Sequence, residues 1–187
     1  MGDLGFIVRE IRKLSWLKNI PRTGWLQCGV PLAICESVAE HTYETSIIAY
    51  FLSRYLMDNG VKVDIAKVLT LSLFHDISEA ITGDIPRVAK KYVRENVTAL
   101  LEENFPSLAN MVKRGGDLES KIVKIADNLS AYLQGLIYNK GGFKEASIIS
   151  FSTLKDAEKI AKEEEDEKIR YLLLDFIGAF RESYKFE

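Results

Sequence analysis

The segment LFHDISEAITGD, residues 73–84, combines a helical pattern of apolar residues with one histidine and three carboxylates. Apolar side chains recur at spacings of three and four through and before this segment, which predicts a helix over residues 64–83. His75 and Glu79 would then lie one turn apart on one face of the helix, with Asp76 beside them. Because charged groups are costly to bury in a core, the segment is a candidate site for chemistry.

The rest of the chain also favours helices. Ser37-Val38-Ala39-Glu40 fits a capping box, and the helix that it begins should end near Asn59-Gly60. Further helices are expected over residues 4–17, 88–105 and 118–139 and in the segment from Ile169 to Phe180, with an ordered irregular connection over 19–36. No alternation typical of strands, no repeat and no domain boundary is visible. The prediction is an all-α fold in which residues 1–187 form a single compact helical domain.

Composition narrows the classes of function. A formal net charge of −2 and a pI near 5.8 argue against binding to a nucleic-acid polymer, although a small anionic ligand needs only one or two cations. No secretory leader and no run of about 18 apolar residues is present, so we expect a cytoplasmic protein without a membrane segment. Cys28 and Cys35 are expected to be buried thiols, and EEEDE at 163–167 to be a solvated helix face.

The two histidines of the chain, His41 and His75, are candidate metal ligands. Each lies on a helix with a strongly apolar face and has an acidic neighbour, and a third helix carries Asp127 among apolar residues. Each residue also has an ordinary interpretation: a hydrogen-bonded core histidine, or an aspartate that is paired or faces solvent. Taken together, His41, His75, Asp76 and Asp127 offer two nitrogen and two oxygen ligands.

This set of ligands predicts a single catalytic ion. Four protein ligands leave positions open for water and substrate on an ion that prefers five or six, and two histidines are too few for a two-metal centre. Mixed nitrogen and oxygen ligation is compatible with Mn, Co, Fe, Ni or Zn. The physiological metal is therefore left open.

The order of these residues resembles the HD-domain superfamily of metal-dependent phosphohydrolases. ESVAEH at 36–41, HDISEAITGDIP at 75–86 and KIADNLSAYL at 124–133 are similar to motifs of the small 5′-deoxynucleotidase and HD-domain-containing protein 2 group, and PRTGW at 21–25 extends the likeness. The resemblance covers most of the chain up to about residue 140. It implies an all-helical fold in which His41, His75, Asp76 and Asp127 hold one divalent cation.

The resemblance also implies roles for residues around the ion. Glu79 matches a catalytic glutamate and Asp84 a second functional aspartate, while a surface carboxylate and a turn residue are their ordinary alternatives. Arg22 and Trp25 match an arginine and a tryptophan that contact substrate in the bacterial enzymes, where the two are adjacent; here Thr23-Gly24 intervenes. Core packing is the alternative for Trp25.

We therefore expect a metal-dependent phosphomonoesterase that releases phosphate from (deoxy)ribonucleoside 5′-monophosphates. The deoxynucleotide preference comes from the resemblance alone. Alternatives are an HD-type phosphohydrolase of cyclic nucleotides, nucleoside triphosphates or non-nucleotide phosphates, and a nucleotide-binding protein without catalysis. A homodimer is expected because the family often forms one, while base preference and pathway are left open.

Overall fold

The computed structural model describes residues 4–93, 96–112 and 115–183, which form ten α-helices, two short 3-10 helices and no strand. The α-helices are α1 (Leu4–Leu14), α2 (Thr23–Gln27), α3 (Val38–Asp58), α4 (Ile65–Leu73), α5 (Glu79–Thr82), α6 (Arg87–Lys90), α7 (Val97–Asn104), α8 (Leu118–Lys140), α9 (Ala146–Lys162) and α10 (Glu167–Ser183). The 3-10 helices are η1 (Ser15–Asn19) and η2 (Leu32–Ile34). The predicted all-α class is confirmed.

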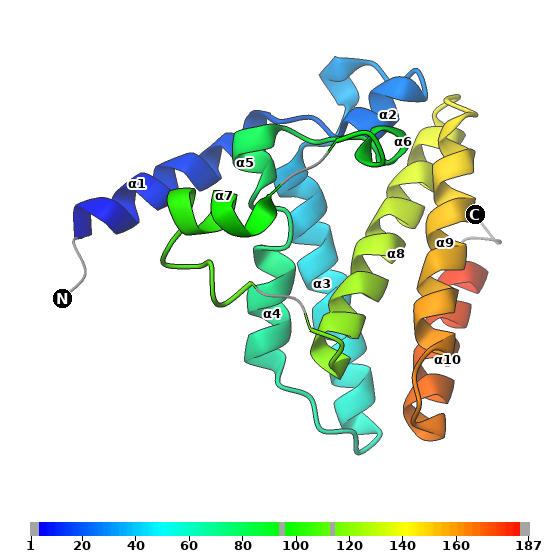
Figure 1. The fold of residues 1–187 in the computed structure, drawn as a ribbon. Helices are drawn as coiled ribbons and strands as arrows, with labels where there is room; N and C mark the ends of the chain where they lie inside the picture. The colour runs from blue at the N-terminus through cyan, green and yellow to red at the C-terminus, as the bar shows by residue number, and fades with distance from the viewer. Residues whose placement is uncertain (1–3, 94–95, 113–114, 184–187) are drawn as a thin grey trace.

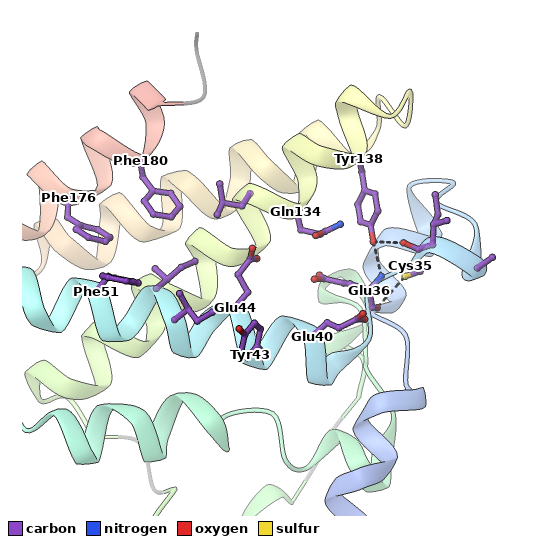
Figure 2. Close-up of a pocket in the computed structure, with 15 residues that line it drawn as sticks. Cys35, Glu36, Glu40, Tyr43, Glu44, Phe51, Gln134, Tyr138, Phe176 and Phe180 are labelled. Carbon is purple, nitrogen blue, oxygen red and sulfur yellow. Dashed lines mark hydrogen bonds between the residues drawn. The ribbon is translucent and has the colours of Figure 1, made fainter. Parts of the chain in front are cut away.

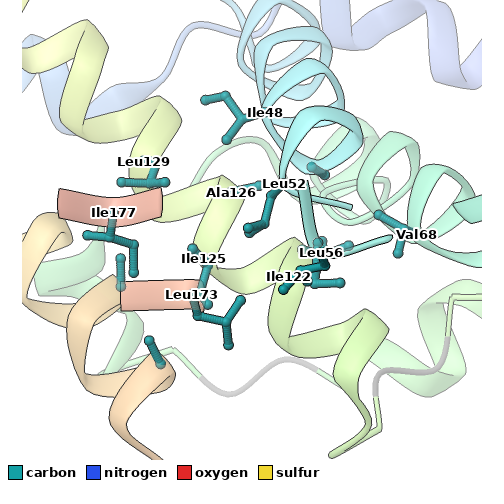
Figure 3. Close-up of a cluster of buried hydrophobic side chains, with 14 of the residues drawn as sticks. Ile48, Leu52, Leu56, Val68, Ile122, Ile125, Ala126, Leu129, Leu173 and Ile177 are labelled. Carbon is teal, nitrogen blue, oxygen red and sulfur yellow. The ribbon is translucent and has the colours of Figure 1, made fainter. Parts of the chain in front are cut away.

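Helices α3 and α8 form the centre of the molecule. Figure 1 shows α4 on one side of this pair, α9 and α10 on the other, and α1 projecting from the bundle. Apolar side chains from these helices form the main core, with Leu52, Leu56, Ile122, Ile125 and Leu129 fully buried (Figure 3). Each such side chain contributes roughly 1.5–3 kcal/mol of burial free energy, so the core fixes the relative positions of α3 and α8.

The start of α3 is fixed as predicted. Ser37 Oγ accepts a hydrogen bond from the Glu40 amide at 3.2 Å, and Glu40 Oε2 accepts one from the Ser37 amide at 2.6 Å. This capping box satisfies two amides that would otherwise lack partners at the helix end. It also fixes the first turn of α3, immediately before His41.

Helix α9 was not anticipated, because its buried face carries small or weakly apolar residues. Ala146, Ser150, Ala157 and Ala161 lie against α8, where Gly135 allows the two backbones to approach. A Cβ atom at Gly135 would lie 2.6 Å from Ser150 Oγ, which is too close. The close contact between α8 and α9 thus depends on small side chains on both helices.

The continuous helix predicted over residues 64–83 is wrong. Helix α4 ends at Leu73, and residues 74–78 form tight turns before α5 begins at Glu79. At this break the carbonyl oxygen of Ser72 contacts His75 Nδ1 at 2.8 Å. Local turn hydrogen bonds, such as that from the Glu79 amide to the Asp76 carbonyl at 3.0 Å, replace the helical pattern.

Other boundaries also differ from the expectation. The predicted helix over 88–105 is divided into α6 and α7, and the first helix ends at Leu14 and continues as η1. Most of the acidic segment 163–167 connects α9 to α10 instead of lying within a helix. Both cysteines are free thiols, but they are half-buried and not buried as expected. No helix among the described residues could cross a membrane.

Candidate metal centre and substrate cavity

The four predicted metal ligands come together from three parts of the chain. His41 lies on α3, His75 and Asp76 on the turn between α4 and α5, and Asp127 on α8. His41 Nε2 lies 2.9 Å from Asp127 Oδ1, His75 Nε2 lies 3.1 Å from Asp76 Oδ2, and the two Nε2 atoms are 3.4 Å apart. Both imidazole side chains are fully buried, so core packing fixes their positions.

The hydrogen bonds of the histidines indicate a site for a cation. The Ser72 carbonyl can only accept, so His75 Nδ1 carries a proton and its Nε2 presents a lone pair. His41 Nδ1 lies 3.1 Å from the Ser130 hydroxyl, which places its Nε2 toward the same point. Two nitrogen lone pairs and two carboxylates that converge repel one another unless a cation or proton lies among them. The donor set therefore fits a divalent ion that accepts nitrogen and oxygen ligands.

The electrostatics of the cluster agree with this fit. Burial raises the pKa of Asp76, but His75, Arg22 and His41 together lower it by more, and the resulting pKa is well below the usual range. Burial also opposes ionisation of Asp127, but its close contact with the His41 imidazole lowers the pKa. Burial, followed by the charge of Arg22, lowers the pKa of His41. For His75, burial lowers the pKa while Asp76 raises it, with a net increase. Two ionised aspartates thus face two imidazoles, a balance that suits a doubly charged cation.

Arg22 lies beside the cluster among three carboxylates. Its Nη1 is 3.1 Å from Asp76 Oδ2, 3.5 Å from Asp84 Oδ1 and 3.7 Å from Glu79 Oε2. Burial lowers the pKa of Arg22, but the three carboxylates together raise it by more. The guanidinium therefore stays charged. The segment before α2 thus supplies one fixed cation to the site.

Glu79 occupies an unusual position. Its Oε2 is buried and has no hydrogen-bond partner among the described residues, and its side chain is only 8% exposed. Burial, and next the charge of Asp76, raises the pKa of Glu79 to about 8. A buried carboxylate oxygen without a hydrogen bond costs free energy, which favours a role toward a ligand or a water molecule.

Asp84 connects the turn after α5 to the start of α2. Its Oδ2 accepts hydrogen bonds from the amide of Thr23, at 2.5 Å, and from the hydroxyl of Thr23, at 2.7 Å. Asp84 is therefore a turn residue that caps another segment, and it also lies near Arg22. In this way it fixes the position of the segment that carries Arg22.

A cavity of about 770 Å³ opens beside the cluster. His75, Asp76 and Glu79 line one side of it. Its remaining wall is mostly apolar and includes Ile85, Val93, Val97, Leu101 and Val112. Lys90 also lines the cavity, and both Lys90 and its neighbour Lys91 are exposed.

A family model for the HD domain matches residues 14–170. The chain belongs to the HD-domain family. The match includes the four clustered residues, Arg22 and Glu79, and HD domains bind a divalent metal ion.

Individual relatives agree with this HD-domain assignment. The 5′-deoxynucleotidase HDDC2 of Danio rerio is 30% identical over 148 residues, which cover 72% of this chain and 70% of that protein. The 5′-deoxynucleotidase plu3092 of Photorhabdus laumondii is 25% identical and aligns over 78% of this chain and 81% of its own. A conserved hypothetical protein from Pyrococcus furiosus has a similar structure, with a TM-score of 0.82 and 33% identity over 94% of this chain and 99% of the other.

Trp25 is not among the residues that line the cavity of about 770 Å³. It is 3% exposed, its ring contacts Tyr138 edge-on at 5.4 Å between centroids, and its Nε1 donates a 2.6 Å hydrogen bond to Glu36 Oε1. These contacts fit the alternative of core packing better than direct contact with substrate. They attach α2, and with it the segment of Arg22, to the start of α3.

Several residues near the HD-domain site were not singled out from the sequence. Ser72 and Ser130 contact the two histidines, and Glu44 contacts Ser130. Serine occurs in helices for many reasons, and the contact of Ser72 uses its backbone, so neither spacing nor composition marks these residues.

Proposed function

We propose that this chain is a metal-dependent 5′-nucleotidase that hydrolyses (deoxy)ribonucleoside 5′-monophosphates to nucleoside and phosphate. The observation that carries the proposal is the convergence of two imidazole Nε2 atoms with two carboxylates beside a cavity of about 770 Å³. The names of relatives in a vertebrate and a bacterium, both 5′-deoxynucleotidases, support the same reaction. The deoxynucleotide preference rests on these relatives.

In this proposal His41, His75, Asp76 and Asp127 hold one divalent ion, which is Mn, Co, Fe, Ni or Zn. Such an ion polarises a phosphate oxygen and makes water more acidic. Both histidines of the chain are used by this one set of ligands. A single ion is therefore the expected stoichiometry.

The surrounding residues position the substrate and move protons. Arg22 binds the phosphate through its guanidinium, which suits phosphate oxygens. A water oxygen forms the new bond to phosphorus while the bond to the sugar 5′-oxygen breaks. In its ionised form Glu79 would take a proton from the water at Oε2 and then give one to the leaving 5′-oxygen. Asp84 acts by holding Thr23 and Arg22 in place.

The nucleoside portion of the substrate fits the apolar side of the cavity. Val93, Val97 and Leu101 offer a surface for the base, and Lys90 lies where it can approach the phosphate. Trp25 would act on substrate indirectly, by fixing the segment of Arg22 through its bond to Glu36. Binding of a small monophosphate thus needs few cations, consistent with the net charge of −2.

We also propose that the protein forms a homodimer. Support comes from large apolar side chains that one chain leaves exposed on α1, where Leu4, Val8 and Ile11 are 76%, 62% and 59% exposed. Sedimentation equilibrium measures the mass directly. A mass of one chain at micromolar concentration would contradict the dimer without affecting the proposed reaction.

The experiment for the reaction is phosphate release from a panel of 5′- and 3′-monophosphates, with deoxy and ribo sugars. Metal-depleted protein is assayed alone and after addition of manganese, cobalt, nickel, zinc or magnesium. We expect metal-restored release from the 5′-monophosphates, with faster rates for the deoxy forms. Release from none of them with any metal would refute the nucleotidase and favour another phosphoester or a binding function.

A further inference from the structure

A chain of hydrogen bonds leads from His41 to a second surface of the molecule. His41 Nδ1 lies 3.1 Å from Ser130 Oγ, and Ser130 Oγ lies 2.7 Å from Glu44 Oε2. Ser130 is on α8, while His41 and Glu44 are on α3, so these hydrogen bonds connect the two central helices. His41 and Ser130 are fully buried, which prevents solvent water from replacing either contact freely.

The protons in the hydrogen bonds from His41 through Ser130 to Glu44 have one favourable arrangement. Ser130 has one hydroxyl proton and two neighbours that could accept it, and the Glu44 carboxylate is the closer and stronger acceptor. The Ser130 oxygen can then accept the Nδ1 proton of His41. With Nδ1 protonated, neutral His41 must present its Nε2 lone pair toward His75 and Asp127.

The two histidines are oriented by different means. His75 Nδ1 contacts a backbone carbonyl, that of Ser72, which accepts under all conditions. His41 contacts a hydroxyl, which can donate or accept, so its orientation depends on the group behind the hydroxyl. Glu44 supplies that group.

Burial raises the pKa of Glu44, but the hydrogen bond from Ser130 favours its ionised form. Glu44 lines a groove of about 690 Å³ between α3, α8 and α10, which contains Gln134, Phe51 and Phe180 (Figure 2). Glu44 is half-buried, so one end of the chain of hydrogen bonds contacts this groove while the other ends at a buried imidazole. An ionised carboxylate costs less free energy at the groove than it would at the centre of the core.

We propose that Ser130 and Glu44 are positioning residues that hold His41 with its Nε2 lone pair directed at the metal centre. The inference rests on the proposed metal-dependent function and adds two residues to it. Partners that orient a ligating histidine typically change metal affinity by about 10- to 100-fold when they are removed. The expected effect is therefore a loss of metal affinity in a protein that remains folded.

The test measures zinc affinity by competition with a chelator and records the histidine Nδ1–H signals of the zinc-loaded, ¹⁵N-labelled protein. The chain has two histidines, so two signals are expected, and the one from His75 serves as an internal reference. The variants are Ser130→Ala, Glu44→Leu and Glu44→Gln. Ser53→Ala is the matched control, because Ser53 is also fully buried on a central helix and its hydroxyl donates to the Ala49 carbonyl of the same helix.

We expect Ser130→Ala and Glu44→Leu to weaken zinc binding by about 10- to 100-fold and to shift the His41 signal, with the His75 signal unchanged. Glu44→Gln should lose less affinity than Glu44→Leu, since its amide oxygen can still accept from Ser130. If Ser130→Ala bound zinc as wild type does, or if Ser53→Ala lost as much affinity, the positioning role would be wrong. Failure of the wild-type protein to bind zinc or any other tested divalent ion would instead refute the metal centre itself.

Discussion

Glu36 should make the stability of this protein fall as the pH rises. The residue is 9% exposed and lies between α2 and α3, and its carboxyl group accepts the 2.6 Å hydrogen bond from Trp25 Nε1. Burial raises the pKa of Glu36 from 4.5 to about 7, although the bond from Trp25 and the charge of Arg22 oppose the shift. Replacing this residue by glutamine keeps the shape and an acceptor for Trp25 but removes the ionisation.

The magnitude follows from the two pKa values. The folded protein binds the Glu36 proton more tightly than the unfolded chain does, so the stability that Glu36 contributes is fully present below pH 4.5 and is lost as the pH rises to about 7. Each pKa unit corresponds to about 1.4 kcal/mol, which gives a total of about 3 kcal/mol. Between pH 5 and pH 8, Glu36→Gln should therefore gain about 2–3 kcal/mol relative to wild type.

Urea unfolding of both proteins at pH 5, 6, 7 and 8 measures this change. Any constant cost of placing an amide NH₂ group in the site cancels, because only the pH dependence of the difference is compared. Glu40→Gln is the control, since it removes an exposed carboxyl from the same helix end and keeps the capping box. A difference between Glu36→Gln and wild type that stays constant with pH would refute the reasoning.

Three further changes test the site. Glu79→Gln should lower the turnover number by about 10²- to 10⁴-fold while one metal ion per chain still binds, as measured by phosphate release and metal analysis; a near-normal rate would exclude Glu79 from proton transfer. Lys90→Met should raise KM for a monophosphate by about tenfold, corresponding to about 1.4 kcal/mol. Lys91→Met should leave KM unchanged, and equal effects of the two would assign no special role to Lys90. Asp84→Ala removes the acceptor for Thr23 and should cost about 1 kcal/mol of stability in urea unfolding, whereas Asp84→Asn should cost less; equal losses would contradict the capping role.

Local signals in the sequence were sufficient to predict the two central helices, α3 and α8. The capping box at Ser37 and the apolar period of residues 118–139 predicted α3 and α8 closely, and these helices carry His41 and Asp127. Apolar side chains recur along both helices at the helical period, which can be recognised without knowledge of contacts that are distant in sequence. The assignment of His41, His75, Asp76 and Asp127 as ligands stays a prediction that rests on the residue types and on the family resemblance.

Other features depend on contacts that are distant in sequence. The break at residues 74–78 is accompanied by a contact between His75 and the Ser72 carbonyl, which competes with the helical hydrogen-bond pattern. Helix α9 is buried through small residues against Gly135, so it lacks a strong apolar stripe. The bond between Ser130 and Glu44 joins residues 86 positions apart. Such pairs become visible only when the helices are placed in space.

The central claim is that one divalent ion, held by His41, His75, Asp76 and Asp127, supports hydrolysis of a nucleoside 5′-monophosphate. The most direct measurement is titration of metal-depleted protein with manganese or cobalt while phosphate release from deoxyadenosine 5′-monophosphate is followed. We predict no release without metal and a linear rise that ends at one ion per chain. Release that persists in the metal-depleted protein, or a rise that continues to two ions per chain, would contradict the account.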